Sequence, residues 1–258
     1  MHSGDYDKDC GIWSPQGDIP QIKHACAAVA NGTVIVGLCS NNYALLAGFR
    51  KKQQSDFSSY DEKLFKIDDH CGIAIAGMTA DARVLAEYMR NECLEHKYVY
   101  DGPMNVGRLV AQIGEKAQTK TAQGGKRPYG VGLLVQSYTE DTGKAGIYET
   151  SPSGDFYEYK AMAIGGRAQR AKTYLEKHFE TFPEESLEKL IEHVVKAVAL
   201  TVEQDTEPTT LNIDVSIVGK DSPWRKLPAA ELQPYITKAA ADAPAASAAV
   251  DDAMDTSG

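Results

Sequence analysis

Hydrophobic residues near the start of the chain repeat with the period of a helix. Over residues 18–32, the apolar side chains that share one helical face are Ile22, Ala25, Cys26 and Val29. Asp18 suits the N-cap and Pro20 suits the first turn. Asn31-Gly32 suits the end of the helix, because both residues tolerate the left-handed conformation. The pattern therefore predicts a short amphipathic helix before residue 33.

Four β-rich runs follow, and two helical patterns come after them. The runs are residues 33–38, 43–49, 64–67 and 72–76. Thr79 suits the N-cap of the next helix, with Asp81 in its first turn. The apolar positions that predict the two helices are Leu85, Tyr88, Met89 and Cys93 for the first, and Val106, Leu109, Val110, Ile113 and Ala117 for the second.

The same succession of strands and then helices appears a second time. The predicted strands are residues 130–138, 145–149, 156–159 and 161–164, with the turn signals EDTGK and SPSGD between them. A helix over 167–180 follows, then a longer helix that Pro183 opens and that ends near Val202, and a strand over 212–218. Because strands and helices come in groups, without strict alternation, the sequence predicts an α+β sandwich in one domain.

The composition changes abruptly at Lys238. From there the chain is rich in Ala and Asp and holds almost nothing that could anchor a core. The sequence therefore predicts a disordered tail over 238–258, a sandwich domain over 19–237 and a separate N-terminal segment over 1–18.

Charge and cysteine usage narrow the class of protein. The formal net charge is -9, which argues against nucleic acid or an anionic membrane as the main partner. Local basic runs at Arg50 and at Lys126-Arg127 are interpreted as solvated loops. The five cysteines follow no repeated spacing, and no apolar run is long enough for a secretory signal or a membrane span. We expect a soluble protein of the cytoplasm and nucleus.

Two motifs suggest chemistry but lack the necessary context. Cys93-x-x-His96 is half of a zinc site without a second half at a usable spacing. The segment AQGGKRPYG lacks the spacing and the strand-to-helix setting of a phosphate loop, so a surface turn is the better interpretation. The sequence predicts no metal and no cofactor.

Thr33 has two interpretations. In the first, Asn31-Gly32 ends a helix and Thr33 opens a buried strand. In the second, the Gly32-Thr33 bond is cut and Thr33 becomes a nucleophile whose own α-amine, with an ordinary pKa of about 7.7–8.0, acts as the base. Cutting would discard a well-formed helix. The residues alone therefore favour the structural interpretation and leave the catalytic one open.

Six motifs, taken together, resemble the alpha subunits of the proteasome core particle. In family order they are YDKD at Tyr6, WSPQGDIPQI at Trp13, VIVGL at Val34, EKLFKIDDHCGIAIAGMTADARVL at Glu62, RPYGVGLLV at Arg127 and AMAIGGRAQRAKTYLE at Ala161. They cover nearly everything from Tyr6 to about Lys238. The resemblance implies a four-layer αββα sandwich, with two sheets between helix layers, of the N-terminal-nucleophile hydrolase type.

The resemblance also bears on Thr33. Beta subunits of this family include threonine proteases, whereas alpha subunits keep an N-terminal extension and are not proteolytic. With VIVGL aligned, Thr33 takes the place of the nucleophile and Lys63 falls close to the catalytic lysine. Phe49, however, replaces the supporting aspartate, and Gly166 replaces a supporting serine. Phenylalanine can neither accept a proton nor hold a lysine, so we expect no catalytic residue and an uncut Thr33.

A role in assembly and gating is what the resemblance implies instead. The implied partners are other alpha subunits in a seven-membered ring, the beta-ring subunits, and regulatory particles that dock on the ring. The residues that match the family's gate are Tyr6, Asp7 and Pro15, while His24 replaces the helix tyrosine and Lys23 the glutamate before it. These departures predict that the chain contributes only weakly to the open gate.

The resemblance further implies a pocket that captures the C-terminal tail of a regulator. Lys63 matches the lysine that binds the tail carboxylate, and Gly32, Gly77 and Met78 match other residues of that pocket. From the residues alone, a solvated surface lysine is the alternative for Lys63. Sequence leaves these two interpretations open.

Overall fold

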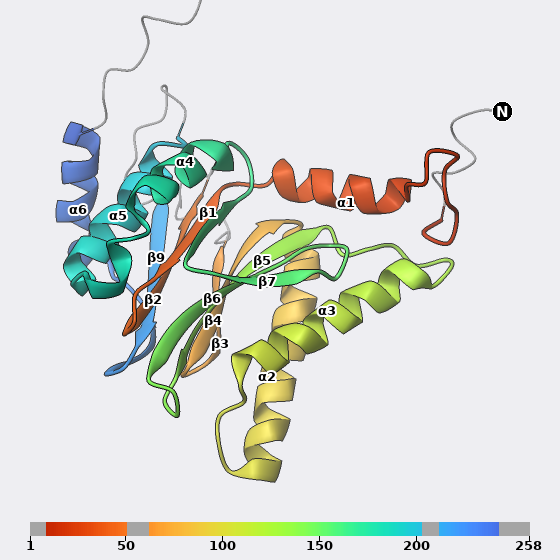
Figure 1. Ribbon diagram of the computed structural model, residues 1–258, viewed down its shortest axis with the longest axis horizontal. Helices are drawn as coiled ribbons and strands as arrows, with labels where there is room; N and C mark the ends of the chain where they lie inside the picture. The colour runs from red at the N-terminus through yellow and green to blue at the C-terminus, as the bar shows by residue number, and fades with distance from the viewer. Residues whose placement is uncertain (1–8, 51–61, 203–211, 243–258) are drawn as a thin grey trace, which may run out of the picture.

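Two antiparallel sheets form the centre of the computed structural model, which describes residues 9–50, 62–202 and 212–242 (Figure 1). The first sheet has the order β10 (Ser222–Lys226), β9 (Ile213–Gly219), β2 (Tyr43–Phe49), β1 (Ile35–Cys39) and β8 (Ala161–Ile164). The second has the order β3 (Leu64–Asp68), β4 (Cys71–Gly77), β5 (Val131–Thr139), β6 (Lys144–Thr150) and β7 (Phe156–Tyr159).

Helices cover the outer face of each sheet. The helices α2 (Thr79–Tyr100) and α3 (Val106–Ala122) pack on the second sheet. The helices α4 (Ala168–His178) and α5 (Leu187–Ala199) pack on the first, with α6 (Ala229–Asp242) against α5. Figure 1 shows these two groups on opposite sides of the sheets, with α1 (Pro20–Ala30) across one end. The predicted four-layer αββα sandwich is confirmed. None of the helices in the described ranges is long and apolar enough to cross a bilayer.

The apolar runs of the sequence are explained by burial on both faces of each sheet. Successive side chains of a strand point to opposite faces. In β2, Leu45 and Ala47 therefore pack under the α4–α6 helices, whereas Ala44 and Leu46 pack between the sheets. A strand covered on both sides reads as a continuous apolar run, as YALLAGF does.

Three helix starts differ from the sequence predictions. Ile19, not Asp18, is the N-cap of α1 and makes no side-chain cap, because its side chain is apolar. Asp18 pairs with Lys23 instead. Met78, not Thr79, is the N-cap of α2. Pro183 lies in a separate 3-10 turn (Phe182–Glu184), and α5 begins only at Leu187. The fully buried Phe182 fixes that turn and separates it from the helix.

The domain also extends farther toward the C-terminus than the sequence predicts. The sequence does not predict the strand β10, because its short segment SPWRK contains a proline, which usually argues against a strand. The helix α6 runs through Asp242, so the predicted boundary after residue 237 falls inside it. Its apolar side chains are spaced widely, yet Leu232, Ile236 and Ala239 are all buried. Residues 243–258 lie outside the described ranges.

Candidate functional site

Thr33 lies between α1 and β1, at the end of the sandwich that α1 covers. The Gly32 carbonyl oxygen accepts a hydrogen bond of 2.7 Å from the Gly166 N–H, which fixes the peptide just before Thr33. The Thr33 Oγ1 atom is buried and has no hydrogen-bond partner among the described residues. A hydroxyl in this setting is a structural residue of an intact chain, not a positioned nucleophile.

Among the described residues, Phe49 and Gly166 replace two groups that would assist a nucleophile at Thr33. A Cβ built on Gly48 would lie 3.1 Å from the Lys63 Cβ, so this face of β2 is turned toward Lys63. The next residue, Phe49, points to the opposite face and packs under the helices. Phe49 is thus directed away from Lys63, and its apolar ring could not support a lysine in any case. Gly166 contributes only its backbone.

Lys63 is buried even in the isolated chain, with 6% of its surface exposed. The alternative of a solvated surface lysine is therefore wrong. The carbonyl oxygen of Lys63 accepts a hydrogen bond of 3.1 Å from the Ile75 N–H, which continues the β3–β4 ladder. Gly77 follows two positions farther along β4, so Lys63 lies at the same end of the second sheet as Gly77.

Three of the four residues predicted for the pocket are packed directly together. A Cβ on Gly32 would overlap the backbone nitrogen of Gly77. Gly77 has φ 111°, and its own Cβ would overlap the Gly130 carbonyl oxygen. That same oxygen accepts the Met78 N–H at 2.9 Å, and the Met78 side chain is 44% exposed. The end of α1, the end of β4 and the loop before β5 thus meet at one surface.

An ion pair that sequence reasoning missed holds this surface in place. Arg127 donates two hydrogen bonds, of 2.6 and 2.8 Å, to the two carboxylate oxygens of Asp81 in the first turn of α2. The Gly130 N–H donates to the same carboxylate at 2.9 Å. The hydrogen bonds from Arg127 lower the pKa of Asp81, with further help from Gly130 and despite partial burial. The motif RPYG was the available signal, but its arginine was interpreted as part of a solvated loop.

Another ion pair, which is buried, lies near the same end, at the residue that follows β2. The Arg50 Nε is 3.0 Å from a carboxylate oxygen of Asp214, and the Lys226 Nζ is 3.1 Å from the same oxygen. Arg50 is 4% exposed, so the interpretation of its run as a solvated loop is wrong for this residue. Two cations sharing one carboxylate satisfy charges that would otherwise be costly to bury.

The predicted gate residues lie only partly within the described ranges. Pro15 sits in a turn in which the Ser14 N–H donates to the Asp18 carbonyl at 2.8 Å. Lys23 pairs with Asp18, and His24 lies on the exposed side of α1. Tyr6 and Asp7 lie outside the described residues, so their part in the gate stays a prediction.

The fold and the site define the class of protein. A sandwich of the N-terminal-nucleophile hydrolase type, in which the nucleophile position follows an intact helix and lacks its supporting groups, is a noncatalytic member of that class. A family profile described as proteasome subunit matches residues 29–218. The chain belongs to the proteasome subunit family.

Curated relatives refine this assignment to the alpha type. The chain is 47% identical to "Proteasome subunit alpha type-1" of Dictyostelium discoideum over 237 residues, which is 92% of this chain and 94% of the relative. It is 44% identical to the Drosophila melanogaster protein of the same name, over 87% of this chain and 80% of the relative. A Schizosaccharomyces pombe relative named "Probable proteasome subunit alpha type-6" is 40% identical over 96% of this chain and 90% of the relative. The chain is a noncatalytic alpha-ring subunit of the proteasome core particle, most like alpha type-1.

Proposed function

We propose that this alpha subunit joins six other alpha subunits in a seven-membered ring, rests on the beta ring, and docks regulatory particles at the surface beside Lys63. It acts in the cytoplasm and nucleus and has no catalytic step of its own. The observation that supports docking is the direct packing of Gly32, Gly77 and Met78 at the end of the sheet where Lys63 lies. The missing side chains of Gly32 and Gly77 let the ends of α1 and β4 meet at this surface, and Lys63 supplies a cation for a terminal carboxylate.

Because Lys63 is buried, a carboxylate that reaches its ammonium group must leave water, and this cost offsets part of the attraction between the two charges. An ammonium group shielded from water attracts a carboxylate more strongly, because the effective dielectric constant is lower. A charge-assisted hydrogen bond at such a site contributes on the order of 1.5–3 kcal/mol, or roughly ten- to a hundredfold in affinity. The exposed Met78 side chain gives the tail an apolar contact at the same surface.

The test is to assemble core particles that carry Lys63→Met in this subunit and to titrate them with a photoreactive peptide that ends in a regulator's C-terminal sequence. Methionine keeps the volume of the buried stem, so packing is retained while the charge is lost. Cross-linking to this subunit should fall at least about tenfold. Lys66→Met is the matched control, since Lys66 lies three positions farther along the chain, in β3, but is exposed and pairs with Asp69 at 2.5 Å.

A change in the probe provides a test that does not depend on folding. The same peptide with a C-terminal amide lacks the carboxylate and should lose the same factor on the wild-type particle. Equal cross-linking by the acid and the amide, or by wild type and Lys63→Met, would return Lys63 to a purely structural role. Particles that fail to incorporate the wild-type chain beside other alpha subunits would contradict the ring assignment.

We also propose that the N-terminal segment of this chain contributes only weakly to opening of the gate. In this chain Lys23 is held by Asp18, so it stabilises the turn around Pro15 instead of the position that the family's glutamate would take. Substituting Lys23→Glu and His24→Tyr restores the family pattern, and it should raise regulator-stimulated peptide hydrolysis by the assembled particle. Unchanged stimulation would show that this N-terminus already contributes fully.

A further inference from the structure

The layer between the two sheets contains a polar side chain that apolar packing does not explain. Gln136 on β5 is fully buried, and its Nε2 donates a hydrogen bond of 2.9 Å to the Ser216 Oγ on β9. The other atom of the same amide group, Oε1, is also buried and has no hydrogen-bond partner among the described residues. An amide oxygen in this state is costly, because it has lost its hydrogen bonds with water and gained none in return.

Trp224 on β10 carries the complementary donor. Its indole Nε1 is buried and likewise has no hydrogen-bond partner within the described ranges. A Cβ built on Gly72 would overlap this nitrogen, so the N–H edge of the indole fills the space that a side chain at position 72 would take. The indole nitrogen only donates and the amide oxygen only accepts, so the two unpaired atoms are chemically matched.

The strand register places these two atoms near each other. Gly72 and Gln136 are directly opposed in the antiparallel pair of β4 and β5. Their Cβ positions therefore lie about 4.5–5.5 Å apart on one face. That face is the one between the sheets, because Ala74 and Leu134, each two positions away, pack in the cluster between the sheets. The Trp224 nitrogen over Gly72 is thus within the span of one small bridging molecule from the Gln136 amide.

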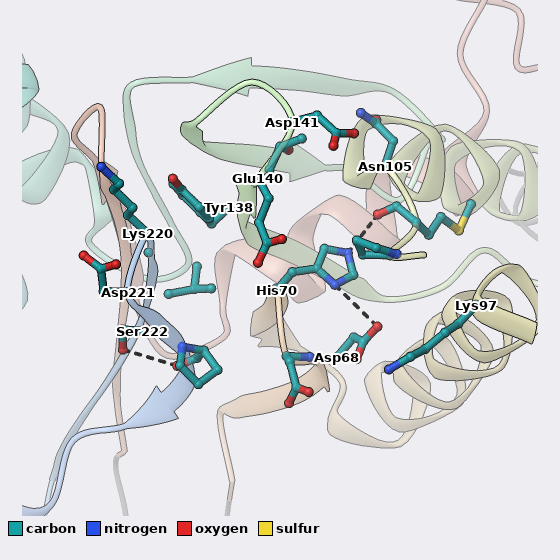
Figure 2. Close-up of a pocket in the computed structure, with 17 residues that line it drawn as sticks. Asp68, His70, Lys97, Asn105, Tyr138, Glu140, Asp141, Lys220, Asp221 and Ser222 are labelled. Atoms are coloured by element: carbon teal, nitrogen blue, oxygen red, sulfur yellow. Dashed lines mark hydrogen bonds and ion pairs between the residues drawn. The ribbon is translucent and has the colours of Figure 1, made fainter. Parts of the chain in front are cut away.

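The open cavity at this end of the molecule is a different feature. Figure 2 shows that cavity, with Tyr138 of β5 and Ser222 of β10 among the side chains around it. Gln136 and Trp224 lie two positions away from these residues on the same strands, and neither of them lines the cavity. Because both unpaired atoms are shielded from solvent, only a very small polar ligand can serve them.

We propose that one water molecule is bound between the sheets, where it accepts a hydrogen bond from the Trp224 Nε1 and donates one to the Gln136 Oε1. Buried waters typically bond two to four polar groups. The Ser216 hydroxyl lies beside the same amide group and supplies its proton as the third bond.

This water joins β10 of the first sheet to β5 of the second. The Trp224 N–H of the backbone already donates a bond of 2.7 Å to the Asp69 carbonyl in the turn between β3 and β4. The water adds a link through the side chain of the same residue. Together the two links hold the sheets at a fixed separation at the end of β4 that lies far from Gly77.

The direct test is a structure of the assembled core particle at a resolution that shows ordered water. A peak should lie within hydrogen-bond distance, about 2.7–3.2 Å, of both the Trp224 Nε1 and the Gln136 Oε1. A direct bond between these two atoms, or the absence of ordered density between them, would overturn the proposal.

An NMR measurement on the full chain tests the same site in solution. The indole N–H of Trp224 should show cross-relaxation with a long-lived water, whereas Trp13, which is 65% exposed, should show only contact with bulk water. Gln136→Met keeps the length of the side chain and removes the acceptor, so the Trp224 signal from bound water should disappear. Gln169→Met, at an exposed position of α4, is the matched control and should leave it unchanged.

Trp224→Phe assigns the indole signal, because it removes that signal alone. A bound-water signal that survives Gln136→Met would show that this amide does not hold the water, which would overturn the proposal. If Gln136→Met does not fold, the wild-type measurement still decides, since an indole N–H of Trp224 without a long-lived water neighbour contradicts the bridge.

Discussion

The backbones of Gly32 and Gly77 touch, so that a Cβ on Gly32 would overlap the Gly77 nitrogen. Gly77 itself has φ 111°, a conformation that favours glycine. This contact joins the end of α1 to the end of β4. It also brings Met78 beside them, so the proposed docking surface depends on the absence of two side chains as much as on the presence of Lys63.

Gly32→Ala is expected to destabilise the chain by about 1–3 kcal/mol, because the new methyl group meets backbone atoms that cannot rotate away. The measurement is urea unfolding of the full chain. Gly102→Ala is the control, since a Cβ there would approach only the Tyr100 carbonyl oxygen, at 3.9 Å. Equal losses for the two variants would show that the Gly32 contact relaxes without cost.

Thr33→Val should raise the free energy of unfolding by up to about 1 kcal/mol. Valine has nearly the shape of threonine, and the substitution removes a buried oxygen that has no partner among the described residues. Peptide hydrolysis by the assembled particle should be unchanged, and intact mass should show Thr33 inside the chain. A loss of hydrolysis, or a mature chain that begins at Thr33, would restore the catalytic interpretation.

Arg127→Ala should lower the free energy of unfolding by about 1 kcal/mol. The side chain of Arg127 is 57% exposed, so solvent screens much of its attraction to Asp81, whose carboxylate keeps the bond from Gly130. Lys126→Ala provides the control, because Lys126 is exposed and, within the described ranges, its side chain bonds Gln123 three positions earlier. Urea unfolding of the two variants and of wild type gives the comparison. A loss below that of Lys126→Ala would contradict a positioning role for the pair.

His193 should make stability depend on pH. Tyr174 bonds its Nδ1 at 2.8 Å and Glu185 lies 3.2 Å from its Nε2, while His178 and Glu192 face it from nearby. Burial lowers the pKa of His193 below its ordinary value of 6.5, the charge of Glu185 opposes this, and His178 adds to it. Between the folded pKa and 6.5 the unfolded chain binds more protons, so stability falls as pH decreases through this window.

The variant that checks this pH dependence is His193→Gln. It keeps a polar side chain at the site but does not titrate. Its free energy of unfolding should change less than that of wild type between about pH 7 and pH 5.5. Denaturant unfolding at several pH values supplies both slopes. Parallel slopes would assign the acid sensitivity of the chain to other groups.

The secondary structure was largely predictable, because most elements bury a regular apolar pattern. The strands β2, β4 and β5 carry strong patterns and appear where the sequence placed them, and α5 appears within its predicted range, although it begins four residues later and ends three residues earlier. The sequence does not predict β10 or the full length of α6, because tertiary contacts determine the local structure of both. Ser222–Lys226 becomes a strand by pairing with β9, and α6 is held by the buried side chains of Leu232, Ile236 and Ala239, which are too widely spaced to form a strong pattern.

The candidate site was predictable only through the resemblance of its motifs. Gly32, Gly77 and Met78 are ordinary residues in sequence, and their contact depends on how three segments converge. The bond between Asp81 and Arg127 spans 46 positions, so no local pattern could reveal it. Burial of Lys63 likewise arises from packing across β2, because Gly48 lacks the side chain that would displace it.

Truncation distinguishes the ordered end of the domain from the tail. A chain that ends at Asp242 should unfold as the full chain does, because the residues removed are polar or small and lack anchors for a core. A chain that ends at Thr237 should be less stable by about 1 kcal/mol or more, since it loses the buried Ala239 and shortens α6 by more than a turn. It also loses the ion pair of 2.8 Å between Lys238 and Glu192, whose exposed side chains make a smaller contribution.

Thermal and urea unfolding of both chains provide the measurement, and Lys238→Ala in the full chain isolates the effect of the ion pair. Equal stability of the two truncated chains would show that the last turn of α6 does not support the fold.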